Sequence, residues 1–293
     1  MPSKYEAEVN LENKNSSHTL IVQLVGYDKR VLDVGASTGY LAEALAERGC
    51  RVTGIEIDPG AARQAEEHCE RVIVGNVEDL DLAVELGGET FDVIVFGDVL
   101  EHLKDPLQIL KRFKSFLSPR GYVVASIPNV AHGSVRLALM QGEFRYRSLG
   151  LLDNTHLRFF TIESLEQLFK EADLLITELR RTKRGVFDAE IEVDSGSVTD
   201  ETLRKVQEDP EALTYQFVLT AYPFGEAGTL ATYEKILFEL SRKLRDFEEL
   251  QRLLNTRTKQ LAEREREVTR LSQEVYDLRS ELARIVQSGK GEV

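Results

Sequence analysis

The sequence of 293 residues is poor in cysteine and has no long apolar run. Its two cysteines, Cys50 and Cys69, do not form a C-x-x-C pair, which argues against a disulfide framework and against a zinc site. No run of about 18 apolar residues occurs, and the first eight residues are polar and charged, so we expect neither a membrane span nor a signal peptide. These absences predict a protein of the reducing cytoplasm.

A net positive charge is also missing. The formal charge is -13, and residues 226–293 contain 13 acidic and 13 basic side chains, so the whole net negative charge lies in residues 1–225. Nucleic-acid phosphates require a basic surface. We therefore expect no nucleic-acid partner.

What the sequence does contain is a glycine turn between a strand and a helix. Residues 31–34 are apolar apart from one aspartate, Gly35 and Gly39 flank small residues, and helical spacing begins at Tyr40. The dinucleotide pattern G-x-G-x-x-G is not met, because Ser37 and Tyr40 stand where its second and third glycines belong. This mismatch weakens an NAD interpretation.

The spacing D-x-G-x-x-x-G of Asp33, Gly35 and Gly39 resembles the first motif of class I S-adenosylmethionine (SAM) methyltransferases. The resemblance implies that the loop, including Ala36 and Ser37, wraps the methionine end of SAM. It also implies that Asp33 orders the loop and the amino end of the cofactor.

Two later strand ends extend the expected cofactor site. Glu56 closes a strand about 20 residues after the glycine turn, the spacing at which an acidic side chain binds ribose hydroxyls. A solvated carboxylate at a strand end is the alternative. The resemblance adds Ile57 beside it, and Asn76 and Val77 as the adenine-binding segment. Asn76 stands where an aspartate is commonest, but an amide can also bond the adenine edge.

Residues 91–97 form a buried strand that leads into Asp98, Glu101 and His102, and this stretch resembles the fourth motif of the same class in its Glu-His variant. The resemblance implies cofactor contacts at Gly97 and Asp98. The spacing also resembles the E-x-x-E-H pattern with which ubiquinone-pathway O-methyltransferases hold a divalent metal. It would place a Mg²⁺-like ion on Asp98, Glu101 and His102. The alternative is a structural pair that caps the next helix.

Five strand–helix steps precede two further strands, at 174–181 and 214–222. This order predicts an α/β fold, a doubly wound and mostly parallel seven-stranded sheet of the Rossmann-like methyltransferase type. We assign residues 1–225 to this domain. The long segment at about 130–161 interrupts the pattern, and we interpret it as a lid over the substrate.

Methyl transfer to a hydroxyl requires a group that takes up the proton, and histidine suits this at neutral pH. His102, His132 and His156 are the candidates, since two follow strands four and five and the third lies on the lid. Each has a structural alternative, such as a helix cap or the polar face of a strand.

Residues 226–293 follow a heptad pattern. Apolar residues fill eight successive a positions and five of eight d positions, whereas Lys243, Arg257 and Arg264 occupy the other three. The pattern predicts a helical coiled coil that self-associates or binds a partner protein.

We therefore expect a SAM-dependent methyltransferase that methylates a hydroxyl of a glycan or a small molecule. The alternative is a coiled-coil scaffold whose methyltransferase-like domain binds SAM without catalysis. RNA or protein methylation is disfavoured by the acidic body and, for amine acceptors, by the absence of an Asn/Asp-Pro-Pro-Tyr-type motif.

Overall fold

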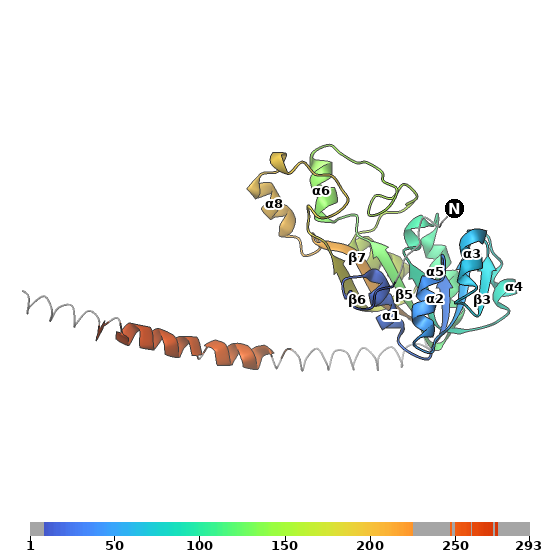
Figure 1. Ribbon diagram of the computed structural model, residues 1–293, viewed down its shortest axis with the longest axis horizontal. Helices are drawn as coiled ribbons and strands as arrows, with labels where there is room; N and C mark the ends of the chain where they lie inside the picture. Colours follow the sequence, from blue (N-terminus) through green and yellow to red (C-terminus); the bar gives the residue numbers. More distant parts are fainter. Residues whose placement is uncertain (1–8, 225–246, 248–249, 259, 272, 275–293) are drawn as a thin grey trace, which may run out of the picture. The chain divides into compact units, whose positions relative to one another are not determined.

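The computed structural model describes residues 9–224, 247, 250–258, 260–271 and 273–274 (Figure 1). The chain divides into two units, Met1–Tyr233 and Glu234–Val293, which we describe separately. Within the described residues, no helix is both long and apolar enough to cross a membrane.

The first unit is built on one seven-stranded sheet in the order β3-β2-β1-β4-β5-β7-β6. The strands are β1 (Arg30–Val34), β2 (Arg51–Glu56), β3 (Arg71–Val74), β4 (Phe91–Gly97), β5 (Leu117–Pro128), β6 (Leu174–Lys183) and β7 (Thr214–Pro223). The first five run parallel, whereas β7 is antiparallel to both of its neighbours, β5 and β6. The predicted mostly parallel seven-stranded sheet is confirmed.

Helices cover both faces of this sheet, with short 3₁₀ turns at two further places. The helices and turns are α1 (Ser17–Val25), α2 (Tyr40–Ala46), α3 (Pro59–Ala65), α4 (Leu82–Leu86), η1 (Leu100–His102), α5 (Pro106–Lys114), α6 (Gly133–Met140), α7 (Ile162–Glu171), η2 (Ser195–Ser197) and α8 (Asp200–Gln207). Successive side chains of a strand point to opposite faces. Leu32 therefore packs in the cluster with α4, α5 and α7, while Val31 packs with α1 and α2.

Local capping fixes where the helices after β2 and β4 begin. Asp58 accepts hydrogen bonds from the backbone N–H groups of Gly60 and Ala61, and Pro59 occupies the first helical turn of α3. Asp105 caps α5 in the same way, ahead of Pro106. These caps end the loops at the carboxyl edge of the sheet, where the candidate site lies.

Residues 130–161 leave the sheet after β5 and come back to it beside β4. Helix α6 of this insertion packs against α8, which comes later in the chain (Figure 1). Leu137 on α6 lies in one apolar cluster with Val206 on α8. The backbone N–H groups of Leu157 and Arg158 then donate to the carbonyl of Glu101, at 2.8 and 3.0 Å. The insertion is thus hydrogen-bonded to the turn that follows β4.

In the second unit, residues 250–258 and 260–271 are helical. The predicted seam residues that are described are all exposed, by 46–65%: Phe247, Leu250, Leu254, Leu261, Val268 and Leu271. The remaining apolar seam residues, Tyr233, Ile236, Leu240, Val275, Leu278, Leu282 and Ile285, lie outside the described residues. The coiled coil stays a prediction, and the helical residues carry the apolar stripe that it requires.

Candidate active site

The glycine turn after β1 has a backbone that only glycine adopts without strain. Gly35 and Gly39 have φ angles of 79° and 85°. A Cβ atom on Gly35 would lie 2.6 Å from a methyl group of Val99, and one on Gly39 would lie 2.8 Å from the Cα of Ala65. The turn therefore forms a narrow cradle that side chains at these two positions would fill.

The amides of this loop are held by β2. Gly35 and Ala36 donate their N–H groups to the carbonyl of Ile55, at 2.8 and 3.0 Å. The N–H of Ser37 donates to Oε2 of Glu56 at 2.7 Å, while the N–H of Asp58 donates to Oε1 at 2.8 Å. Each carboxylate oxygen keeps a second acceptor position for a ribose hydroxyl. The predicted loop residues and Glu56 thus form one hydrogen-bonded unit.

Asp33 lies under the loop with its carboxylate buried. The side chain is 1% exposed, and neither carboxylate oxygen has a hydrogen-bond partner. Burial, followed by the nearby charge of Glu56, raises the Asp33 pKa to about 7. A buried carboxyl group with both oxygens unpaired fits a cationic ligand.

Tyr40 lies near three of the predicted acidic residues, although the sequence analysis did not assign it a role. Burial raises its pKa, and the carboxylates of Asp33, Asp98 and Glu56 act in the same direction. The ring of His18, on α1, lies 4.9 Å from the Tyr40 ring. Three carboxylates around one position suit the sulfonium and ammonium charges of SAM. A polar side chain at the first position of α2 was the only sequence signal for Tyr40.

The remaining predicted cofactor residues lie at the ends of β2 and β3. Ile57, next to Glu56, is 63% exposed, and its contact with the adenine ring stays a prediction. Val77 is only 9% exposed and its side chain packs in the core, which leaves its backbone for the predicted contact. The amide of Asn76 bonds the backbone N–H of Glu78 and the carboxylate of Asp79.

At the end of β4, Gly97 is followed by Asp98, which has a φ angle of 54°, rare for a residue with a side chain. Its Oδ1 accepts hydrogen bonds from Ser126 at 2.9 Å and from Gln216 at 2.8 Å. Desolvation raises the Asp98 pKa, while these hydrogen bonds and the charge of His18 lower it. Gln216 was missed by the sequence analysis, because nothing local to β7 shows that it reaches β4.

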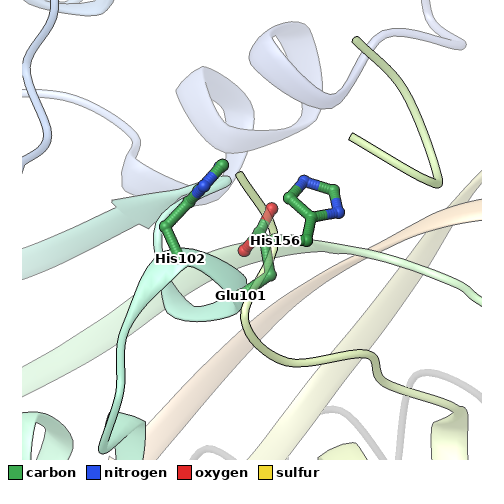
Figure 2. Close-up of side chains that lie close together, drawn as sticks. All are labelled: Glu101, His102 and His156. Atoms are coloured by element: carbon green, nitrogen blue, oxygen red, sulfur yellow. The ribbon is translucent and has the colours of Figure 1, made fainter. Parts of the chain in front are cut away.

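The turn η1 and the insertion bring three functional side chains together (Figure 2). Ligand atoms of Glu101, His102 and His156 lie within 4.8 Å of one another, and the two imidazole rings meet edge to face with centroids 4.8 Å apart. Glu101 is 1% exposed and its carboxylate has no hydrogen-bond partner. Burial raises its pKa well above the usual range, as do the charges of Asp98 and Asp153.

His132, the third candidate base, lies apart from this group. It is fully buried and caps α6, with Nδ1 in contact with Ser134 and Nε2 placed 3.1 Å from the carbonyl of Arg184. Burial lowers its pKa. Both ring nitrogens form contacts within the fold, which suits a helix cap, and the catalytic role of His132 stays a prediction.

The set of metal ligands implied by the resemblance differs in one residue from the cluster that the structure brings together. Asp98 is not part of the cluster, since its carboxylate bonds Ser126 and Gln216, and His156 stands with Glu101 and His102 instead. Two imidazoles and one carboxylate differ from the oxygen ligands that Mg²⁺ prefers. The donor atoms present do not fit a Mg²⁺ site.

Comparison with known proteins identifies the family of the chain. A family model described as a methyltransferase domain matches residues 13–179, more than half of the chain, so the chain belongs to this family of class I SAM-dependent methyltransferases.

Among curated proteins, the chain is 30% identical over 156 residues to the ubiquinone biosynthesis O-methyltransferase of Acinetobacter baylyi. That match covers 52% of this chain and 65% of the relative, so the chain spans less than two thirds of the relative's length. The corresponding enzyme of Haemophilus ducreyi is 32% identical over 156 residues, which cover 51% of this chain and 62% of that protein.

Solved structures show the same fold at low identity. A SAM-dependent methyltransferase from Archaeoglobus fulgidus superposes with a TM-score of 0.51 at 16% identity, over 72% of this chain and 94% of that one. A SAM-dependent methyltransferase from Thermotoga maritima, described as a possible histamine N-methyltransferase, gives 0.50 at 19% identity, over 72% and 89%. These likenesses establish the fold and leave the acceptor open.

Proposed function

We propose that this chain transfers the methyl group of SAM to a hydroxyl of a small molecule or a glycan. The observation that carries the proposal is the arrangement at the carboxyl edge of the sheet. A glycine cradle with an unpaired buried Asp33 lies at one side, and His102 and His156 lie together after β4.

SAM carries its methyl group on a sulfonium, which is already a good leaving group. The protein therefore has to align the acceptor behind the methyl group and to take up the proton that the acceptor hydroxyl loses. Glu56 would accept hydrogen bonds from the ribose hydroxyls, and Ile57 would lie against the adenine ring. Asn76 and the backbone at Val77 would bond the adenine edge. Asp33 and Gly97 would hold the amino end, with Asp98 beside them.

The hydroxyl proton would pass to an imidazole of His102 or His156. Both are half-buried, in contrast to His132, and both lie beside the end of β4, where open α/β sheets bind their ligands. The insertion at 130–161 would then contribute both a catalytic histidine and the walls of the acceptor site.

An oxygen acceptor is favoured over a nitrogen acceptor by two points. The curated relatives are named O-methyltransferases, and a proton-accepting histidine pair is needed for a hydroxyl more than for an amine. The glycan or small-molecule class follows from the acidic body, which does not suit nucleic acid.

The test is SAM turnover against a panel of sugars, phenols and carboxylates, measured as the formation of S-adenosylhomocysteine (SAH). Turnover with a hydroxyl acceptor, lost in the Glu56→Ala variant, is the expected result. Cofactor binding without turnover on any acceptor would favour the scaffold alternative.

A second role is favoured by the exposed apolar stripe of the C-terminal helix. We propose that residues 226–293 associate through this stripe with a second copy or a partner protein, while residues 1–225 carry the chemistry. Burial of apolar surface, at about 25 cal/mol per Å², would drive the association.

A further inference from the structure

The Glu101 carboxylate presents a problem that the fold itself does not resolve. It is 1% exposed, its two oxygens have no hydrogen-bond partner, and Asp33 is the only other side chain of which this is true in the described part of the chain. Unpaired buried carboxylates are costly unless a cation or donor completes them. Figure 2 shows the Glu101 carboxylate between the rings of His102 and His156.

We propose that Glu101, His102 and His156 bind one divalent transition-metal ion of the zinc type. One ligand atom from each residue lies within 4.8 Å of the other two. Ligand atoms on one zinc ion stand about 3–3.5 Å apart, because each bond is about 2.0–2.2 Å long. Small side-chain rotations close this difference.

The donor types define the metal. Two imidazoles and one carboxylate form the His₂Glu set of catalytic zinc sites and the two-histidine, one-carboxylate set of open iron sites. Both sets leave coordination positions for other ligands. Mg²⁺ prefers oxygen and keeps its waters, so this set selects against it.

The surroundings of His102 fit a metal ligand. Its Nδ1 lies 3.2 Å from the backbone carbonyl of Thr155, and metal-bound histidines commonly donate their second ring N–H to such a carbonyl. With the hydrogen on Nδ1, the lone pair lies on Nε2. Thr155 is itself fixed by the buried Asp153, which accepts from its N–H at 2.8 Å and from its hydroxyl at 2.7 Å.

Backbone hydrogen bonds to Glu101, another proposed ligand, hold the chain next to His156. The N–H groups of Leu157 and Arg158, next in the chain, both donate to the backbone carbonyl of Glu101. The insertion is therefore already aligned with η1, and the ion would tie the two segments through side chains as well. With both imidazole lone pairs engaged by the ion, the ion would replace the imidazole as the group that assists loss of the acceptor proton, since a bound Lewis acid lowers the pKa of an oxygen ligand. That last role rests on the proposed function, whereas metal binding does not.

The experiment uses full-length protein that has been stripped with chelator and then freed of it. Co²⁺ serves as the probe, since it takes the same ligands as zinc and absorbs visible light in such sites. We expect a visible band that saturates at one Co²⁺ per chain, is displaced by Zn²⁺, and persists in excess Mg²⁺.

Variants identify the ligands. Glu101→Gln, His102→Ala and His156→Ala should each weaken Co²⁺ binding at least tenfold, and His156→Gln is a second variant at the insertion. His68→Ala, at a histidine that follows α3 and is not a member of the cluster, should bind Co²⁺ as the wild type does. SAH binding by calorimetry, measured on the His102 and His156 variants, verifies that the fold is intact. It also separates this proposal from the proposed function.

Two results would overturn the proposal. One is the absence of a saturable Co²⁺ band in protein that binds SAH. The other is a band that survives in both His156 variants, since this would move the site away from these three residues.

Discussion

The backbone N–H of Ser37 donates a hydrogen bond of 2.7 Å to Oε2 of Glu56. This bond joins the glycine turn after β1 to the acidic end of β2, two segments that the sequence analysis treated as separate cofactor contacts. Glu56 therefore shapes the loop and is also the expected ribose ligand, so its loss should affect both ends of the cofactor.

Replacement of Glu56 by alanine should strongly weaken cofactor binding. Hydrogen bonds to a charged group contribute about 1.5–3 kcal/mol each, and loss of one such bond lowers affinity by roughly 10- to 100-fold. Calorimetry with SAH measures the effect, and Glu67→Ala, at an exposed glutamate that follows α3, is the control. Equal SAH affinity in Glu56→Ala and the wild type would refute the assignment.

Asp33 should make SAH affinity depend on pH. Its pKa of about 7 in the cofactor-free protein means that the carboxyl group is largely protonated below that pH. The cofactor's ammonium group favours the ionised form, so binding releases a proton at low pH and affinity rises as pH increases through about 7. Calorimetry between pH 6 and pH 8 tests this, and Asp33→Asn should show a flatter profile.

The same carboxyl group should affect stability. Its folded-state pKa of about 7 lies above the unfolded value of about 3.9, so the folded protein keeps a proton that the unfolded chain has released. The free energy of unfolding, relative to that of Asp33→Asn, should therefore fall as pH rises from about 4 to about 7 and then stay constant. Urea unfolding of both proteins at several pH values measures this difference. A difference that grows with pH would contradict it.

Gly39→Ala should disrupt the cradle. Alanine at a φ of 85° costs about 1–2 kcal/mol, and its Cβ would lie 2.8 Å from the Cα of Ala65. Gly87→Ala is the matched control, because Gly87 is also left-handed, with a φ of 57°, but has nothing within 4 Å of an added Cβ. Thermal unfolding and SAH binding should show a larger loss for Gly39→Ala than for Gly87→Ala.

The fold was predictable from the sequence because its signals are local. Apolar β-branched runs such as residues 31–34 and 91–97 indicate buried strands, and their alternation with helical spacing gives a parallel sheet. The position of Glu56 beside the glycine turn was also predictable, since the distance from Gly35 to Glu56 is set by one helix and one strand.

The acceptor side was less predictable, because it depends on contacts between distant segments. Gln216 on β7 donates a hydrogen bond to the Asp98 carboxylate after β4, and the fold of the insertion brings His156 beside His102. Neither contact leaves a local pattern. His132 shows the opposite case, since a histidine that looks available in a loop proves to be a buried helix cap.

Deletion of residues 230–293 should give a monomer that still binds SAH. The described seam residues, such as Leu254 and Leu261, are exposed in a single chain and would be buried by a second helix. Light scattering on full-length and truncated protein tests the difference. A monomeric full-length protein, or a truncated one that no longer binds SAH, would contradict this division of roles.

The charged d positions should limit that association. Arg257→Leu combined with Arg264→Leu should strengthen it, because both arginines would otherwise lie in the apolar seam. Analytical ultracentrifugation at several concentrations measures the change, and Arg252→Leu, at an outer position, should have little effect.

The most direct test of the central claim is the fate of the methyl carbon. Full-length protein is incubated with SAM labelled with carbon-13 in its methyl group and with the acceptor identified by turnover, and the product is examined by NMR and mass spectrometry. The account predicts that the label appears in a methyl ether, bonded to the oxygen of the acceptor hydroxyl. Label bonded to nitrogen or carbon, or no transfer by protein that binds SAH, would contradict it.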